Sequence, residues 1–220
     1  MELDLKELAG KRAALAENEV KQLLKQYGLA TPDYKLVEGT EDHVGLNFPV
    51  VLKVCSDKIL HKTDVEGVKL NIGNQEELHA AFQEFRRKFS REKFLVEEMA
   101  KPGVELIAGL LQDSTFGLSI MVGIGGILTE LYQDASFRVV PINRYDAQQM
   151  LSELKGRKLL EGFRGIKSDR EAVINLLLSL SQLGEDWGNY IDQMDLNPVF
   201  VYEKGLCIVD AKLILRRPPG

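Results

Sequence analysis

The pattern of apolar residues along the chain changes at Gly103, and this change constrains the fold more than any other feature of the sequence. Before it, helical and strand-like segments alternate. After it come short β-branched or aliphatic runs broken by glycine, at Val104–Leu111, Leu118–Val122 and Ile127–Tyr132. Such runs are typical of a sheet of short strands, and helical patterns return later in the chain. With 220 residues, enough for an ample core, the chain is expected to form two closely packed lobes of an α+β fold.

Periodicity predicts the elements of both lobes. Apolar residues at helical spacing indicate a helix over Ala16–Tyr27, and Gly28 follows where a left-handed C-terminal cap costs little. The other expected helices are Gln75–Phe89, Asp146–Leu154 and Asp169–Leu183. The other expected strands are Tyr34–Val37, Val50–Val54, Val68–Ile72, Phe94–Met99, Val199–Tyr202 and Leu206–Leu213, the last two forming a closing hairpin.

These elements define the expected domain boundaries. No internal repeat and no low-complexity linker interrupts the chain. We expect an N-terminal extension over 1–12, a first lobe over 13–95, a second lobe over 96–215 and a frayed tail over 216–220.

Composition and charge exclude several classes of protein. With 45% hydrophobic residues, 28% charged residues and a formal charge of −5, the chain lacks the basic excess needed to bind nucleic acid. No apolar run reaches the roughly 18 residues that span a bilayer, and Met1–Arg12 is charged rather than signal-like. We expect a cytoplasmic protein without membrane association. The two cysteines, Cys55 and Cys207, lie in apolar runs, which argues against a disulfide framework or a zinc site.

Lys53 is the first residue that could carry chemistry. It stands alone among hydrophobic neighbours in the strand Val50–Val54. Burying an ammonium without a partner is costly, so its head must reach an anion, a carboxylate or water. A nucleotide phosphate is one such anion. The alternative is an ordinary lysine on the exposed face of an edge strand.

Two glutamates, Glu97 and Glu98, end the strand Phe94–Met99, and Glu105 follows after a Pro-Gly turn. Alternation directs one of Glu97 and Glu98 inward, where a carboxylate must find a hydrogen-bond donor. Solvated charges at the end of a strand are the alternative explanation.

The closing hairpin carries a third group of polar residues. Asp195 and Asn197 share a face by the period of two, and the return of the hairpin could bring Asp210 beside them. Hard oxygen ligands at one place suit Mg²⁺ held against phosphates. Asp-x-Asn-Pro is also a common turn sequence, so the pattern alone leaves both explanations open.

His61 lies in the polar connection Ser56–Gly67 that follows Lys53. A single histidine in a loop is usually solvated. A neutral imidazole is nevertheless a competent phosphoryl acceptor, so its position must decide between the two.

Taken together, these segments resemble the ATP-grasp subunit of ADP-forming acyl-CoA synthetases, relatives of succinyl-CoA synthetase. The resemblance covers about residues 13–215, with the segments in the expected order, and this ordered set is more specific than any single motif. The segments are Glu17–Gly28, Pro49–Lys53, Ile59–Val65, Gly103–Leu106, Phe116–Gly117, Gly123–Ile127, Ser136–Arg138, Gly162–Gly165, Asp195–Pro198 and Val209–Ala211.

The resemblance implies a two-lobed ATP-grasp fold with nucleotide bound between the lobes. It also implies a reversible reaction in which acyl-CoA, ADP and phosphate give the free acid, CoA and ATP, with Mg²⁺. In this family a phosphoryl group passes from a histidine on a CoA-binding α subunit to a histidine on the ATP-grasp subunit and then to ADP. Nothing in the chain resembles the CoA-binding unit, so the resemblance implies an α subunit as partner.

The family's functional residues match positions of this chain. By matching position, His61 is the phosphoryl carrier of this subunit and Lys53 is the lysine on the nucleotide phosphates. The remaining matches are Glu97, Glu98 and Met99 as the hinge facing adenine and ribose, Glu105 as a further nucleotide-side carboxylate, Asn197 and Asp210 as metal ligands with Asp195 nearby, and Arg138 and Arg164 as arginines that steady phosphate.

One departure from the family pattern leaves room for other functions. The family has Gly-Gly after the Asp-Val of the histidine segment, whereas here Glu66 precedes Gly67. A carboxylate there would add negative charge near the phosphate path and stiffen the segment. Two alternatives remain: an ATP-grasp carboxylate–amine ligase, which needs no carrier histidine, and a non-catalytic nucleotide-sensing ATP-grasp module. Intact His61, Asn197 and Asp210 argue against the sensing module.

Overall fold

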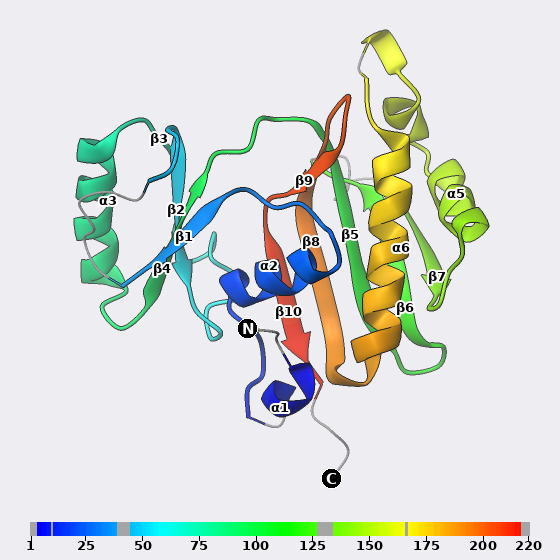
Figure 1. Ribbon diagram of the computed structural model, residues 1–220, viewed down its shortest axis with the longest axis horizontal. Coiled ribbons are helices and arrows are strands. Elements are labelled where there is room, and N and C mark those ends of the chain that lie inside the picture. Colours follow the sequence, from blue (N-terminus) through cyan, green and yellow to red (C-terminus); the bar gives the residue numbers. More distant parts are fainter. Residues whose placement is uncertain (1–3, 10, 39–44, 127–133, 166, 217–220) are drawn as a thin grey trace.

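The computed structural model describes residues 4–9, 11–38, 45–126, 134–165 and 167–216, apart from the side chain of Arg164. These residues form two lobes, each built on one antiparallel sheet and each with its own hydrophobic core (Figure 1). The two-lobed α+β arrangement expected from the sequence is therefore confirmed.

The small lobe is a four-stranded sheet in the order β1-β4-β2-β3, covered on one face by helix α3. Val50, Leu52 and Val54 of β2 pack into the core beneath α3, and burying each contributes about 1.5–3 kcal/mol. The alternate residue Lys53 lies on the opposite face. Helix α3 begins after Asn74, whose side chain caps the first turn. The bounds are β1 Tyr34–Val37, β2 Val50–Cys55, β3 Val68–Ile72, α3 Gln75–Lys88 and β4 Lys93–Glu98.

The large lobe is a six-stranded antiparallel sheet in the order β10-β8-β5-β6-β7, with β9 also paired to β8. Helices α5 and α6 cover one face of it (Figure 1). The bounds are β5 Val104–Asp113, β6 Gly117–Ile124, β7 Ala135–Val139, α5 Arg144–Glu153, α6 Arg170–Trp187, β8 Ile191–Val201, β9 Leu206–Ile208 and β10 Ala211–Leu215, with short 3-10 helices at Arg157–Leu160, Phe163–Gly165 and Gly188–Tyr190.

The other face of the large sheet carries polar side chains. Because Met194 and Leu196 of β8 point into the core beneath the helices, the alternate residues Asp195 and Asn197 lie on the opposite face. We call this the open face of the large sheet.

Helix α2, Glu17–Gln26, lies at the junction of the two lobes (Figure 1). Val20, Leu23 and Leu24 belong to the core of the large lobe. Glu17 and Lys21, one turn apart, are buried as well, although both are charged. The buried side of this helix therefore carries both apolar residues and two charged groups, and the charged groups lie at the junction.

The lobes divide the chain differently from the expected boundaries. Helix α1, Leu5–Ala9, lies within the expected extension and is packed into the large-lobe core. The expected boundary at 95/96 falls inside β4, and the apolar side of α2 packs with the second lobe rather than the first. Of the expected tail, the structure describes only Arg216, whose N–H donates to the carbonyl of Tyr190 at 2.8 Å.

Several local expectations also need correction. The expected strand at 127–132 lies outside the described residues, and neither α1 nor β7 was expected. The sequence Asp195–Pro198 is not a turn, because β8 continues through it with β5 on one side and β9 and β10 on the other. The expected strand Leu206–Leu213 is interrupted at Val209 and Asp210.

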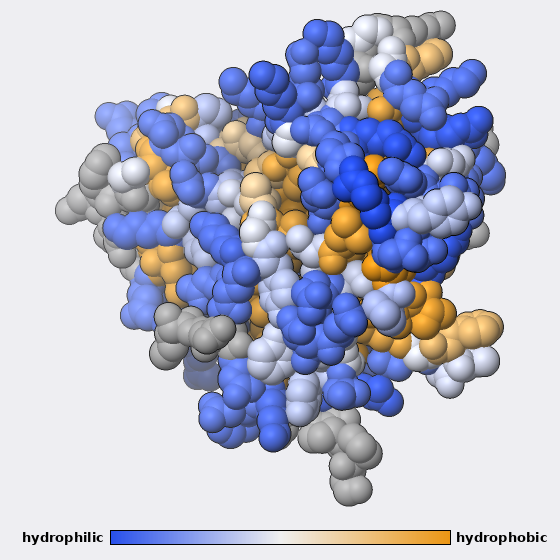
Figure 2. Space-filling model, turned by 45° about the vertical axis from the view of Figure 1, so that its right-hand side comes forward, coloured by the Kyte–Doolittle hydropathy of each residue, from blue (hydrophilic) through white to orange (hydrophobic). Residues whose placement is uncertain are grey.

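In the described part of the chain, no helix is long and apolar enough to cross a membrane. Figure 2 shows hydrophilic side chains over most of one face, with hydrophobic side chains in separate patches.

Candidate functional site

Lys53 finds its anionic partners among carboxylates at the junction. Its ammonium lies 2.9 Å from Oε1 of Glu17 and 2.5 Å from Oε1 of Glu97, and it donates to the carbonyl of Val209 at 3.0 Å. Burial alone would lower the pKa of Lys53, but Glu17 and Glu97 outweigh it and hold that pKa above its ordinary value. The explanation as an exposed edge lysine is wrong, since the side chain is 4% exposed.

Lys21 adds a second buried ammonium to the same carboxylates. It lies 2.8 Å from Oε1 of Glu17, pairs with Glu97 and donates to the carbonyl of Val209 at 3.0 Å. This carbonyl can serve both lysines because it lies at the interruption between β9 and β10. Burial acts to raise the pKa of Glu17, yet Lys53, Lys21 and Lys62 together hold it well below its ordinary value.

Lys62, the residue after His61, connects this cluster to Asp210. Its ammonium lies 2.7 Å from Oε2 of Glu17 and 2.8 Å from Oδ1 of Asp210. The Asp210 pKa is raised above its ordinary value, first by burial and then by the charge of Glu17, despite Lys53 and Lys62. We call Glu17, Lys21, Lys53, Lys62, Glu97 and Asp210 the junction cluster.

Asn197 and Asp195 lie beside the junction cluster on the open face of β8. The N–H of Asn197 donates to the carbonyl of Asp210 at 3.1 Å, so the hairpin does bring these two residues together. Asp195 lies opposite Lys212 in the pairing of β8 with β10. Burial raises the pKa of Asp195, while the charges of Lys212 and His61 act against that shift.

His61 is exposed, and its Nε2 lies 3.2 Å from Nζ of Lys212. The segment that carries it packs closely on β10, because Ile59, Leu60 and Lys62 enclose only a small space with Ala211 and Lys212. His61, Lys212 and Asp195 therefore form a row that continues into Asn197 and Asp210.

Of the residues expected at the hinge, Glu97 is buried, whereas Glu98 and Met99 are partly exposed. Glu97 is the inward member of its pair, as alternation predicts, whereas the carboxylate of Glu98 accepts from Asn47 N–H at 2.8 Å. The N–H of Met99 donates to the carbonyl of Pro49 at 3.0 Å. Beyond the expected hinge, Glu105 is the second residue of β5 and lies on the open face, opposite Phe200 of β8.

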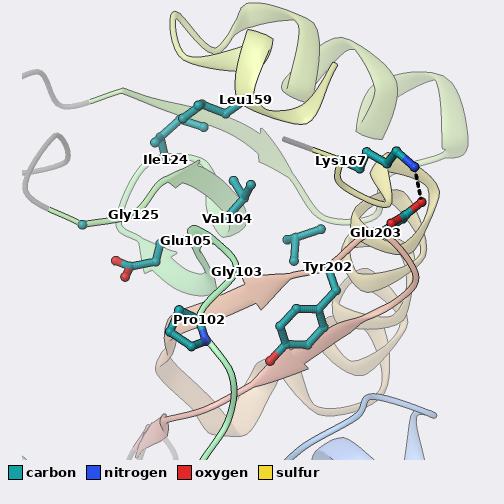
Figure 3. Close-up of a pocket in the computed structure, with 12 residues that line it drawn as sticks. Pro102, Gly103, Val104, Glu105, Ile124, Gly125, Leu159, Lys167, Tyr202 and Glu203 are labelled. Carbon is teal, nitrogen blue, oxygen red and sulfur yellow. Dashed lines mark hydrogen bonds and ion pairs between the residues drawn. The ribbon is translucent and has the colours of Figure 1, made fainter. Parts of the chain in front are cut away.

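Glu105 also lines a cavity of about 750 Å³ at the hinge end of the large sheet (Figure 3). Val104, Ile124 and Leu159 form its apolar wall, and the ion pair of Lys167 with Glu203 lies at its side. None of the junction cluster lines this cavity. This cavity and the buried charges of the junction cluster are thus in different places, and the junction cluster brings several ammonium and carboxylate groups together.

Of the two arginines expected to steady phosphate, Arg138 has a described side chain, and it lies away from the junction cluster. Arg138 lies on β7, at the opposite edge of the sheet from β10. Its neighbour across the ladder is the buried Ile120, so it lies on the helix-covered face, where it pairs with Glu153 of α5. Arg164 lies in the 3-10 helix Phe163–Gly165, and its side chain is outside the described part of the chain.

The side chain of Glu66, the departure from the family pattern, does not belong to the junction cluster. It pairs with Lys88 of α3, and its side chain is 86% exposed. Its backbone has a φ of 52°, in the left-handed region where glycine fits best.

The donor set at Asp210 fits a hard cation. Oδ1 of Asp210 already holds an ammonium at 2.8 Å, and Asn197, whose backbone N–H donates to the Asp210 carbonyl, is an exposed residue. Among the described residues, no three His, Cys, Asp or Glu side chains converge as a metal site. Since Mg²⁺ is usually bound by one or two protein oxygens together with substrate phosphates and water, Asp210 and Asn197 are a sufficient pair.

Sequence patterns missed Glu17, Lys21, Lys62 and Lys212. A signal existed for the first two, because Glu17 and Lys21 have the spacing i, i+4 and Lys21 directly follows the buried Val20. Charged residues on the apolar side of a helix need partners, and those partners come from distant segments that no local pattern identifies.

The fold and the charged junction define a class of nucleotide-binding protein, and comparison with known sequences agrees. A family model of the ATP-grasp domain matches residues 6–215, so the chain belongs to the ATP-grasp family. Within that family its relatives include β subunits of ADP-forming acetate–CoA ligases. It is 42% identical to the β subunit of ligase II of Pyrococcus furiosus, over 95% of this chain and 94% of that subunit.

Two further similarities concern a longer relative and a solved structure. The chain is 40% identical to ADP-forming acetate–CoA ligase II of Archaeoglobus fulgidus, over 91% of this chain but 30% of that protein. A structure of acetyl-CoA synthetase 1 of Ca. Korarchaeum cryptofilum matches with a TM-score of 0.84 and 43% identity, covering 96% of this chain and 97% of that one. That structure contains coenzyme A and Mg-AMPPCP, with its phosphohistidine segment pointing towards the nucleotide binding site.

Proposed function

We propose that this chain is the nucleotide-binding subunit of an ADP-forming acyl-CoA synthetase, and that it passes a phosphoryl group between His61 and ADP. The observation that carries the proposal is the position of His61. Its ring contacts Lys212, which lies opposite Asp195. The next residue in the chain, Lys62, contacts Asp210. A carrier histidine is thereby held one residue away from a contact to a candidate metal ligand.

The transfer step is a displacement at phosphorus. In the direction of ATP synthesis, an oxygen of the β-phosphate of ADP attacks the phosphoryl group on His61. The phosphorus–nitrogen bond breaks, and its electron pair returns to the imidazole nitrogen. Asp210 and Asn197 would hold Mg²⁺, which supplies positive charge that neutralises the phosphates.

Lys53 and Lys62 are the side chains best suited to receive nucleotide phosphate in this subunit. Both are buried: Lys53 meets three carboxylates and Lys62 meets two. A phosphate oxygen can replace a carboxylate oxygen at an ammonium with little change in geometry, since both accept charge-assisted hydrogen bonds. Glu97, Glu98, Met99 and Glu105 remain assigned to the adenosine end of the nucleotide. Arg138 has no part in this proposal.

A CoA-binding α subunit completes the proposed enzyme. The similarity to an archaeal β subunit along 94% of its length, and to only 30% of a longer single-chain ligase, supports a division of the activity between two units. On this basis the chain alone does not turn over acyl-CoA, and the hetero-oligomer with the α subunit does.

Phosphorylation of His61 tests the proposal. Incubating the chain with Mg²⁺ and ATP labelled in its γ-phosphate should give a label that acid removes and base preserves, because the bond joins phosphorus to nitrogen. His61→Ala should abolish the label and leave ATP binding intact. His79→Ala is the matched control, since His79 is exposed on α3.

An acid-stable label, or one that persists in His61→Ala, would contradict the carrier role. Binding of Mg-ATP without any label on the protein would favour the carboxylate–amine ligase, which transfers the phosphoryl group to its substrate carboxylate and needs no carrier histidine. Failure of Mg-ATP to bind the chain at millimolar concentration would contradict both enzymes.

A further inference from the structure

The side chain of Lys212 contacts the imidazole ring of His61. It lies on β10 between the buried residues Ala211 and Leu213, so alternation directs its side chain to the open face. There its ammonium lies 3.2 Å from Nε2 of His61, and Asp195 faces it across the ladder.

The chemistry of the contact determines which nitrogen carries the proton. An ammonium has three donors and no acceptor. A hydrogen bond from Lys212 therefore requires Nε2 of His61 to be the acceptor. A neutral ring with a lone pair on Nε2 has its proton on Nδ1.

We propose that Lys212 is a positioning residue for His61. It donates a hydrogen bond to Nε2, which fixes the orientation of the ring and keeps the lone pair on Nε2, and it then binds the phosphoryl group that Nε2 receives. The inference rests on the proposed carrier role and extends it to a residue that neither the sequence pattern nor the family resemblance singled out.

The second role follows from the charge balance of the transfer. When Nε2 attacks the γ-phosphorus of ATP, the bond to the bridging oxygen breaks and its electron pair leaves with ADP. The ring then carries a phosphoryl group with negatively charged oxygens where the ammonium of Lys212 lay. Lys212 exchanges a neutral acceptor for an anionic one, which strengthens the hydrogen bond.

The surroundings of Lys212 leave its charge available for this exchange. Lys53 meets three carboxylates and Lys62 meets two, whereas no carboxylate in the described residues lies close enough to form an ion pair with Lys212. Asp195 lies on the neighbouring strand and interacts with Lys212 only through its charge: the charge of Lys212 acts to lower the pKa of Asp195.

The tautomer of His61 provides a test that needs no phosphoryl transfer. Long-range ¹H–¹⁵N correlation spectra of the ¹⁵N-labelled chain, recorded where the ring is neutral, should show His61 protonated on Nδ1. The signals are assigned by their loss in His61→Ala. Lys212→Met should shift His61 toward the Nε2-protonated form, and Lys212→Arg should not. A ring protonated on Nε2 in the unsubstituted chain, or unchanged by Lys212→Met, would overturn the positioning role.

The amount of phosphohistidine formed with Mg-ATP tests the second role. Lys212→Met should lower it about 10- to 100-fold at equilibrium, the effect of losing a charged hydrogen bond, while the affinity for Mg-ATP stays unchanged. Lys212→Arg should restore most of it. Lys69→Met, which removes an exposed lysine paired with Glu84, is the matched control.

The outcomes separate this inference from the carrier role itself. Absence of a label on His61 in the unsubstituted chain contradicts the carrier role, and the tautomer spectra still decide on Lys212. A normal label in Lys212→Met keeps the carrier and overturns the phosphoryl-binding role of Lys212.

Discussion

Nζ of Lys62 lies 2.8 Å from Oδ1 of Asp210, so the residue that follows the candidate carrier histidine is bound to a candidate metal ligand. The position of the histidine segment is therefore physically connected to whether Asp210 binds a cation. A cation at Asp210 and the ammonium of Lys62 draw on the same carboxylate.

Asp210→Asn should separate stability from binding. The pKa of Asp210 is raised, so the folded chain binds this proton more tightly than the unfolded chain, and the associated stability is lost as pH rises through the folded pKa. At neutral pH the ionised carboxylate is therefore unfavourable for folding. We expect the metal-free variant to melt at a temperature no lower than the unsubstituted chain, while Mg²⁺-dependent ATP binding falls.

Thermal unfolding with and without Mg-ATP measures both effects of Asp210→Asn. Asp192→Asn, at the exposed start of β8, is the control and should leave both unchanged. A large loss of melting temperature in metal-free Asp210→Asn would contradict the argument from the pKa.

Lys53→Met should destabilise the fold as well as weaken nucleotide binding. The substitution leaves Glu17 and Glu97 buried with one fewer cation, and breaking a buried ion pair costs about 3 kcal/mol or more. Urea denaturation measures the free energy of unfolding. Lys69→Met should change it by less than about 1 kcal/mol, because its pair with Glu84 is exposed. Equal stabilities of the two variants would show that Lys53 is not held by this pairing.

Glu17→Gln should change how stability depends on pH. The folded pKa of Glu17 is depressed, so its contribution is present above the unfolded value of about 4.3 and is lost as pH falls toward the folded pKa. The variant should be less stable than the unsubstituted chain at neutral pH, and the difference should shrink below about pH 4. Denaturation curves from pH 3 to pH 7 test this expectation. A constant difference across that range would exclude Glu17 as the titrating group.

Two neighbouring substitutions in the histidine segment should act in opposite directions. Glu66→Gly removes a side chain from a left-handed conformation and should raise the melting temperature by about 2–4 °C. Gly67→Ala should lower it, because the new Cβ would lie 2.6 Å from Cγ1 of Val54. Thermal unfolding of both variants tests the prediction, and a matching shift in both would contradict it.

Local patterns predicted the elements whose side chains alternate or repeat cleanly. Helices α2 and α3 follow from apolar periodicity, because each packs one apolar side against a core. Strands β2 and β4 follow from short apolar runs, which the structure buries on both faces. Strand β8 was predicted only at its end, since Pro198 suggests a turn. Pairing on both sides overrides that local preference, with a register shift between Leu106 and Ala108 of the neighbouring β5.

Two contacts within the candidate site follow from the sequence. Asn197 and Asp210 meet as the hairpin suggests, and Lys53 is buried beside carboxylates. The identity of those carboxylates could not be derived, because Glu17 and Glu97 come from α2 and β4, far apart in the chain. The face on which Arg138 lies could not be derived from its family position, because a shift of one residue along β7 would turn it to the open face.

Helix α2 has a thermodynamic consequence for the whole molecule. Its leucines are part of the core of one lobe, while Glu17 and Lys21 are bonded to Lys53 and Glu97 of the other. Neither lobe can lose this helix without exposing apolar surface or leaving buried charges unpaired. Heating should therefore melt both sheets in one cooperative transition rather than two, despite their separate cores.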